Sequence, residues 1–144
     1  FSSFVSHIAI FIDWCKENSY RYSIITGNIK DRQQEVEKFQ NDDSIHFFFI
    51  SLKSGSTGLN LTAANYVLFL DPWWNPSTEE QAIARSYRMG QKNKVNVLRF
   101  VSKDSIEEKI LALQKSKKEL SNSVITEHNV EDEIMSNLSE ILAS

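Results

Sequence analysis

Three hydrogen-bond donor side chains recur at helical spacing near the middle of the sequence. Gln81, Arg85 and Arg88 are four and three residues apart, and no acidic residue stands between them. On a helix this spacing places all three side chains on one face, one above the next. Two guanidinium groups and an amide suit a polyphosphate anion better than a structural salt bridge. The spacing is not specific by itself, because many surface helices carry two arginines.

A loop of small and hydroxyl-bearing residues precedes these donors. Residues 54–61 read SGSTGLNL and follow an apolar run, so their backbone N–H groups and hydroxyls could bind phosphate oxygens. The loop is not a Walker phosphate loop, because no glycine in the chain is followed by the Lys-Ser or Lys-Thr pair of that pattern. Taken in isolation, the loop is more simply a strand–helix connection rich in turn-forming residues.

Two adjacent tryptophans lie between prolines in residues 71–76, DPWWNP. Neither a helix nor a central strand can bury both rings there, because each proline removes a backbone donor and restricts the residue before it. At least one tryptophan should therefore be partly exposed. An exposed tryptophan can stack on a base or sugar, dock on another domain, or simply lie at the edge of the core.

Charge is unevenly distributed along the chain. The formal net charge of -3 argues against binding nucleic acid through bulk positive charge alone. Residues 81–103 contain six basic side chains and no acidic one, whereas residues 119–144 contain six acidic side chains and no lysine or arginine. The basic stretch could face phosphate groups or could be an ordinary solvated surface. Its basic residues are Arg85, Arg88, Lys92, Lys94, Arg99 and Lys103.

Hydrophobic periodicity predicts strands and helices that alternate along the chain. Strands are predicted at residues 20–26, 45–51, 66–70 and 95–101, and helices at residues 3–18, 31–39, 78–89 and from residue 104 or 105 onward. Such alternation indicates parallel βαβ units and an α/β fold. We expect a three-layer sandwich with a central parallel sheet, which binds ligands at the carboxyl ends of its strands.

The chain is predicted to be one domain with a short extension. Its 144 residues, 41% of them hydrophobic, are enough to bury a core. We expect the domain to span residues 1–121, with an acidic helical extension at residues 122–144 packed on it. No apolar run is long enough to cross a membrane. Cys15, the only cysteine, suits a buried structural thiol in a reducing, intracellular compartment.

Together these features resemble a known family. Residues 46–109, HFFFISLKSGSTGLNLTAANYVLFLDPWWNPSTEEQAIARSYRMGQKNKVNVLRFVSKDSIEEKI, are similar in order, spacing and extent to the second-lobe signature of the Swi/Snf family. That family lies within the superfamily 2 helicase-like ATPases. Residues 1–4 and 26–27 resemble weaker motifs that precede the signature. The resemblance covers about residues 1–125 and implies a RecA-like C-terminal motor lobe of a DNA-dependent ATPase, with C-terminal helices.

The resemblance implies roles for individual residues. Gln81, Arg85 and Arg88 would form the family's Arg-x-x-Arg motif, in which both arginines reach ATP bound on the opposite lobe and act in catalysis. Arg88 is our first choice as arginine finger, a group that raises turnover in related NTPases by about 10³–10⁵. The positions implied to bind the nucleotide are Gln81, Gly55, Gly58 and Asn60, and those implied to face DNA are Lys53, Ser54, Ser56 and Trp74.

The resemblance also implies partners outside this chain. ATP and Mg²⁺ would both be held mainly by an upstream RecA-like lobe, because this sequence contains neither a Walker lysine nor the acidic metal-binding motif. ATP would draw the lobes together and hydrolysis would release them, moving the protein along double-stranded DNA by sequence-independent backbone contacts. The chain alone would be inactive. The Trp-Trp doublet resembles bacterial and some repair-type branches, so we expect a bacterial cytoplasm, or the nucleus if the protein is eukaryotic.

Two positions depart from the family's pattern. Met89 stands where isoleucine is usual before Gly-Gln, and Thr26 stands where aspartate is frequent before glycine. Neither departure removes a charged catalytic group. Two other functions remain open: a non-catalytic α/β module whose exposed tryptophans and acidic tail dock a protein partner, and an RNA-directed helicase lobe of the same superfamily, which the motifs fit less well.

Overall fold

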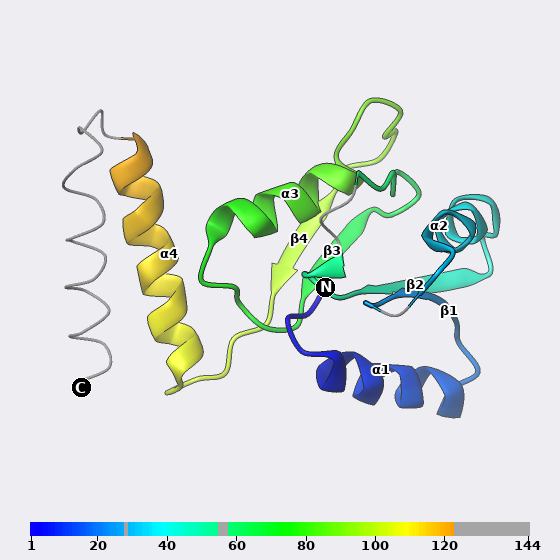
Figure 1. Ribbon diagram of the computed structural model, residues 1–144, viewed down its shortest axis with the longest axis horizontal. Helices are drawn as coiled ribbons and strands as arrows, with labels where there is room; N and C mark the ends of the chain where they lie inside the picture. The colour runs from blue at the N-terminus through cyan, green and yellow to red at the C-terminus, as the bar shows by residue number, and fades with distance from the viewer. Residues whose placement is uncertain (28, 55–57, 123–144) are drawn as a thin grey trace.

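A computed structural model describes residues 1–27, 29–54 and 58–122 of the chain. Within these residues four strands and four helices follow in the predicted order, with no helix between the second and third strands (Figure 1). The strands are β1 (Arg21–Ile25), β2 (Ile45–Ile50), β3 (Tyr66–Phe69) and β4 (Asn96–Arg99), and the helices are α1 (Val5–Glu17), α2 (Arg32–Asn41), α3 (Pro76–Ser86) and α4 (Ile106–Asn122). The predicted terminal extension lies, from residue 123 onward, outside the described residues.

The strands run parallel and form two hydrogen-bonded pairs, β1 with β2 and β3 with β4. The backbone of Phe1 and Ser2 lies between the pairs. The N–H group of Ser2 donates to the carbonyl of Ile50 (3.2 Å), and the N–H group of Leu70 donates to the carbonyl of Phe1 (2.9 Å). These two residues therefore join the pairs into one layer. Sequence periodicity did not assign them to the sheet, because two residues are too few to show alternation.

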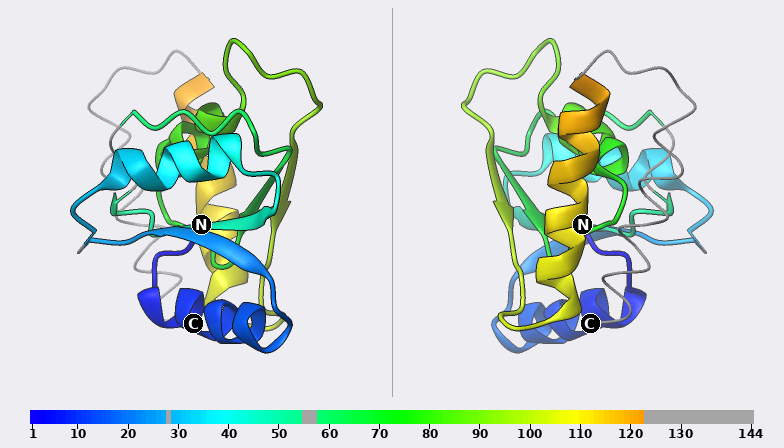
Figure 2. Two further views of the ribbon diagram at one scale, coloured as in Figure 1. Left: turned by 90° about the vertical axis from the view of Figure 1, so that its right-hand side faces the viewer. Right: turned by 90° about the vertical axis from the view of Figure 1, so that its left-hand side faces the viewer.

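Helices α1 and α2 cover opposite faces of the β1–β2 pair (Figure 2). Phe49 packs with Ile8 and Cys15 of α1, whereas its neighbour Ile50 packs with Val36 of α2. Successive strand side chains point to opposite faces, so adjacent residues of β2 supply two different cores. The three-layer α/β arrangement predicted from the sequence is confirmed here.

Helix α3 packs on the β3–β4 pair, where Ala82 meets the buried side chains of Val67 and Phe69. The helix begins at Pro76, two residues before the predicted start. Proline suits the first helical turn because its missing N–H would have no partner there. The side chain of Asn75 accepts a hydrogen bond from the next free N–H group, that of residue 77, at 3.1 Å. Helix α4 lies beside α3 at one end of the lobe (Figure 1).

A cavity of about 540 Å³ opens between β2 and β3. Its walls are mostly apolar and include Phe47, Phe48, Tyr66 and Val67. None of the candidate site residues that the structure describes lines this cavity. These candidate residues therefore lie elsewhere in the fold.

The described part of the chain contains neither a membrane-spanning helix nor a cluster of potential metal ligands. No helix in it has the length and apolar character needed to span a membrane. Across the same residues, His, Cys, Asp and Glu side chains form no group of three that could hold a metal ion.

Candidate functional site

The end of α3 places Arg85 inside the lobe and Arg88 at its surface. The helix ends at Ser86, so Arg88 lies in the turn that follows. The predicted helix at residues 78–89 is too long, and the prediction that the three donors share one helical face is wrong for Arg88. The carbonyl of Arg85 accepts from the N–H group of Leu61 (3.0 Å) instead of from a further helical turn. Gln81 is exposed on the helix itself.

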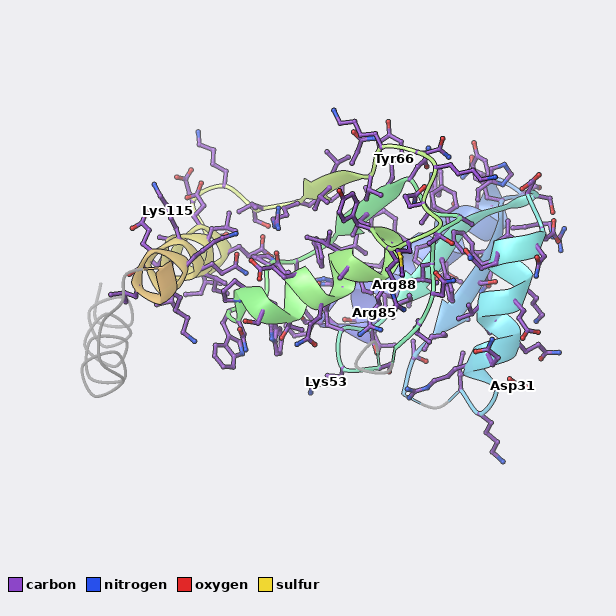
Figure 3. All side chains as sticks on the ribbon, turned by 90° about the horizontal axis from the view of Figure 1, so that it is seen from above. Asp31, Lys53, Tyr66, Arg85, Arg88 and Lys115 are labelled. Atoms are coloured by element: carbon purple, nitrogen blue, oxygen red, sulfur yellow. The ribbon has the colours of Figure 1, made fainter. Side chains whose placement is uncertain are left out.

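The two arginine side chains lie close together at this end of α3 (Figure 3). Arg85 is only 7% exposed. Burial, together with the neighbouring charge of Arg88, lowers the pKa of the Arg85 guanidinium. Arg88 is exposed, and its Nη1 donates to the carbonyl of Leu59 at 3.4 Å, near the upper limit for a hydrogen bond. Two like charges held together in a partly buried place favour an approaching anion.

The end of the hydroxyl-rich loop runs beside this pair. Gly58 and Asn60 are exposed, whereas the leucines on either side of Asn60 are buried. A Cβ added to Gly58 would meet no atom within 4 Å, so packing does not require glycine there. A ligand could approach this stretch of backbone closely. Gly55 and Ser56, also predicted from the sequence, lie outside the described residues.

Ser54 does not face solvent. The residue is 4% exposed, and its Oγ accepts a hydrogen bond from the Oγ of Ser51 (2.7 Å). Its carbonyl accepts from Nη1 of Arg32 (3.1 Å). These bonds close the turn after β2, and the predicted contact of Ser54 with DNA stays a prediction. The neighbouring Lys53 is exposed and stays a predicted DNA contact (Figure 3).

The two adjacent tryptophans have different environments. Trp73 is half-buried against the core under α3, whereas Trp74 is 49% exposed. The prediction that at least one of them is partly exposed is confirmed. Nζ of Lys117, on α4, lies 4.6 Å from the centroid of the Trp74 ring, within the range of a cation–π contact. An exposed aromatic ring beside a cation is a combination that can contact nucleic acid.

Sequence reasoning missed the role of Gln91, which fixes the turn that carries Arg88. Its side-chain Nε2 lies close to three backbone carbonyl groups. The three acceptors are the carbonyls of Thr62 (3.0 Å), Ala64 (2.9 Å) and Ser86 (3.0 Å). Gly90 just before it has a φ of +99°, a backbone conformation that favours glycine. The available signal was the Gly-Gln pair that follows Arg88 and Met89.

Asp71 is a second residue that sequence reasoning did not assign to the site. It is 2% exposed and accepts hydrogen bonds from the Ser2 hydroxyl and from the Ser3 N–H group (2.9 Å), while Nδ1 of His7 lies 3.3 Å from Oδ2. Burial by itself would raise the pKa of Asp71, but these hydrogen bonds outweigh it and lower the pKa. The carboxylate thus ties the loop before Trp73 to the start of the chain and to α1.

Comparison with known proteins identifies the family. A family model described as the helicase conserved C-terminal domain matches residues 1–90. An uncharacterized ATP-dependent helicase of Schizosaccharomyces pombe is 42% identical over 134 residues, which are 92% of this chain and 13% of that protein. A putative SWI/SNF-related matrix-associated actin-dependent regulator of chromatin of Arabidopsis thaliana is 41% identical over 117 residues, 80% of this chain and 13% of that protein. The chain belongs to the Swi/Snf-type ATP-dependent helicases, as their helicase C-terminal domain.

A solved structure supports the same assignment. The crystal structure of the C-terminal part of the Fun30 ATPase domain matches with a TM-score of 0.76 and 35% sequence identity, covering 92% of this chain and 44% of that chain. This match confirms the predicted fold class for a Swi/Snf C-terminal lobe. The chain nevertheless spans only 13% of each of the two relatives named above.

The organisms of the relatives bear on the predicted location. Further relatives include the DNA repair protein RAD5A of Arabidopsis thaliana and the TATA-binding protein-associated factor MOT1 of Saccharomyces cerevisiae. An uncharacterized ATP-dependent helicase of Mycoplasma pneumoniae is also similar, at 40% identity. Because the relatives are mainly eukaryotic, the expected preference for a bacterial cytoplasm is not supported.

Proposed function

We propose that this Swi/Snf lobe is the second motor lobe of an ATP-dependent double-stranded DNA translocase. It would supply arginines to ATP bound on a first lobe of the same parent chain, and it would be inactive alone. The observation that carries the proposal is the Arg85–Arg88 pair: two neighbouring cations at one end of α3, one of them buried, with the pKa of Arg85 lowered by burial and by Arg88.

The two arginines suit different parts of this task. Arg88 is exposed and makes a hydrogen bond of 3.4 Å, so turning it toward a γ-phosphate gives up little. We therefore keep Arg88 as the arginine finger, which stabilises charge that develops on the transferred phosphoryl group. Arg85 is held inside the lobe and would act as a fixed charge behind it. Gln81, Gly58 and Asn60, all exposed, are proposed to border the same nucleotide.

The residues present fit the phosphate end of ATP. Guanidinium groups bind phosphate oxygens through paired charge-assisted hydrogen bonds. Mg²⁺, when bound, would neutralise charge on the phosphate oxygens. We assign its ligands to the first lobe, because the described residues of this lobe contain no cluster of His, Cys, Asp and Glu suited to a metal ion.

Duplex DNA is the proposed track. Lys53 and Trp74 are exposed and carry the two kinds of group, a cation and an aromatic ring, that contact phosphates and bases or sugars. Contacts with the DNA backbone fix the position of the protein on the duplex without reading the base sequence. The relatives named as DNA repair protein and as chromatin regulator support DNA as the partner and the nucleus as the location.

The test compares ATP hydrolysis by the parent chain with and without duplex DNA, with this 144-residue chain assayed beside it. We expect duplex DNA of any sequence to stimulate the parent chain and the isolated lobe to be silent. Hydrolysis by the isolated lobe would overturn the two-lobe proposal. A parent chain whose ATP hydrolysis is not stimulated by DNA would favour a docking module. Equal stimulation of hydrolysis by duplex RNA would favour an RNA-directed helicase.

A further inference from the structure

Glu79 is a buried carboxylate at which three segments of the lobe meet. It lies in the first turn of α3 and is 1% exposed. Its oxygens accept hydrogen bonds from the backbone N–H group of Trp73 (3.1 Å), from Nε of Arg99 (2.7 Å) and from Nε2 of Gln114 (3.0 Å). These donors come from the loop after β3, from β4 and from α4. A buried carboxylate is costly unless it is paired and hydrogen-bonded, and this one is both.

The same network holds Trp73 from both sides of its backbone. Its N–H group donates to Glu79, and its carbonyl accepts from the side chain of Gln114, which also donates to Glu79. Arg99, the charged partner of Glu79, lies over the ring of Phe69 at 5.6 Å and so is itself fixed to the core. The backbone just before Trp74 is therefore held at both the N–H group and the carbonyl of Trp73.

Trp74 begins where this anchored peptide ends. Its ring is 49% exposed and lies beneath Nζ of Lys117 on α4, the helix that also supplies Gln114. The direction in which the ring points is set by the peptide before it and by the position of α4. Glu79 contacts both, through the N–H group of Trp73 and through the side chain of Gln114 on α4.

We propose that Glu79 is a positioning residue that aims the exposed Trp74 ring at DNA. This proposal rests on the proposed function for the role of DNA, but the positioning itself is a separate claim about the loop. Because Glu79 is buried, it would contact neither nucleotide nor DNA itself. Its effect would pass through the Trp73 backbone and through the docking of α4.

The adjacent glutamates supply a matched pair of variants in the parent chain. Glu79→Gln keeps the shape of the side chain and removes the charge that pairs with Arg99. Glu80→Gln removes an exposed carboxylate that pairs with Lys118 at the surface (3.1 Å), and it serves as the control. ATP hydrolysis is measured on the parent chain. Fluorescence is measured on the 144-residue chain carrying Trp14→Phe, in which Trp73 and Trp74 remain of the three tryptophans.

Two readouts separate positioning from general damage. For Glu79→Gln we expect the DNA concentration that half-saturates ATP hydrolysis to rise about tenfold, the loss of one base or sugar contact, with a much smaller change in maximal rate. Iodide should quench the tryptophan fluorescence more strongly and the emission should shift to longer wavelength. Glu80→Gln should match the wild type in both. Glu79→Gln behaving like Glu80→Gln in both readouts overturns the proposal.

Two further variants keep the outcomes distinguishable. Gln114→Ala leaves the Glu79–Arg99 pair intact and removes one hydrogen-bond donor. It should show the same two changes to a smaller degree, and it takes the place of Glu79→Gln if that variant fails to fold. A wild-type response of Gln114→Ala in both readouts would then refute the proposal. Trp74→Ala tests the DNA role directly. If it leaves half-saturation by DNA unchanged, the DNA-facing role of Trp74 is wrong, while the fluorescence of Glu79→Gln still decides the positioning claim.

Discussion

Replacing Asp71 by asparagine tests whether one buried carboxylate fastens the start of the chain to the loop that carries the tryptophans. The carboxylate is 2% exposed and is approached by donors from Ser2, Ser3 and His7. Asparagine keeps the shape but loses the charge and replaces one acceptor oxygen by a donor. Hydrogen bonds to a charged group contribute about 1.5–3 kcal/mol each, and one donor is left unmatched, so we expect a loss of about 2–3 kcal/mol.

The assay is chemical and thermal unfolding of the chain and its variant at pH 7. The melting temperature should fall by about 5–12 °C for a domain of this size. Asp13→Asn is the control, because Asp13 is exposed and pairs only at the surface with Lys16 (3.2 Å), an interaction worth little. A loss of stability in Asp71→Asn that is no larger than the loss in Asp13→Asn would refute the stabilising role of the hydrogen bonds to Asp71.

The difference in unfolding free energy between wild type and Asp71→Asn should depend on pH, which gives a second check. The pKa of Asp71 is lowered in the folded chain below its unfolded value of about 3.9. The stability that the Asp71 carboxylate contributes to the fold is therefore complete above that pH, and it is lost as the pH falls through the folded pKa. The gap in unfolding free energy between wild type and Asp71→Asn should narrow below about pH 4. Other carboxyl groups titrate there in both proteins and cancel in the difference, so a gap that stays constant contradicts the assignment.

Two more predictions concern the turn after α3 and the buried thiol. Gly90→Ala should destabilise the chain by about 1–2 kcal/mol in urea unfolding, because φ is +99° there, whereas Gly58→Ala, whose Cβ would meet open space, should change stability far less. Equal effects would contradict the backbone argument. Cys15 is fully buried and burial raises its pKa, so a thiol reagent should modify it only at the rate of unfolding, and reaction as fast as with a free cysteine peptide would contradict its burial.

The layers of the fold were predictable from the sequence because they follow from local periodicity. The apolar run in residues 45–50 and the helical spacing in residues 3–18 correspond to β2 and α1. The seam between the two strand pairs was not predictable. It depends on Phe1 and Ser2, which bond to residues far along the chain and show no pattern of their own.

The candidate site was predictable in its residue types and less so in its geometry. The two arginines were found from their spacing, yet the helix was drawn too long. The carbonyl of Arg85 is taken by Leu61, which is distant in the sequence, and that of Ser86 by the side chain of Gln91, so helix propensity does not encode where the helix ends. Ser54 looked available for DNA because hydroxyls in loops usually are, whereas here its hydroxyl closes the turn. Glu79 was missed because a glutamate in a first helical turn ordinarily faces solvent.

The most direct test of the central claim is ATP turnover by the parent chain carrying Arg88→Ala, at saturating ATP and duplex DNA. The control is Lys92→Ala, which removes an exposed cation from the same basic stretch. The proposal predicts that Arg88→Ala loses about 10³-fold or more in turnover while ATP still binds, and that Lys92→Ala stays near wild type. Turnover by Arg88→Ala equal to that of the wild type would show that this lobe does not supply the arginine finger.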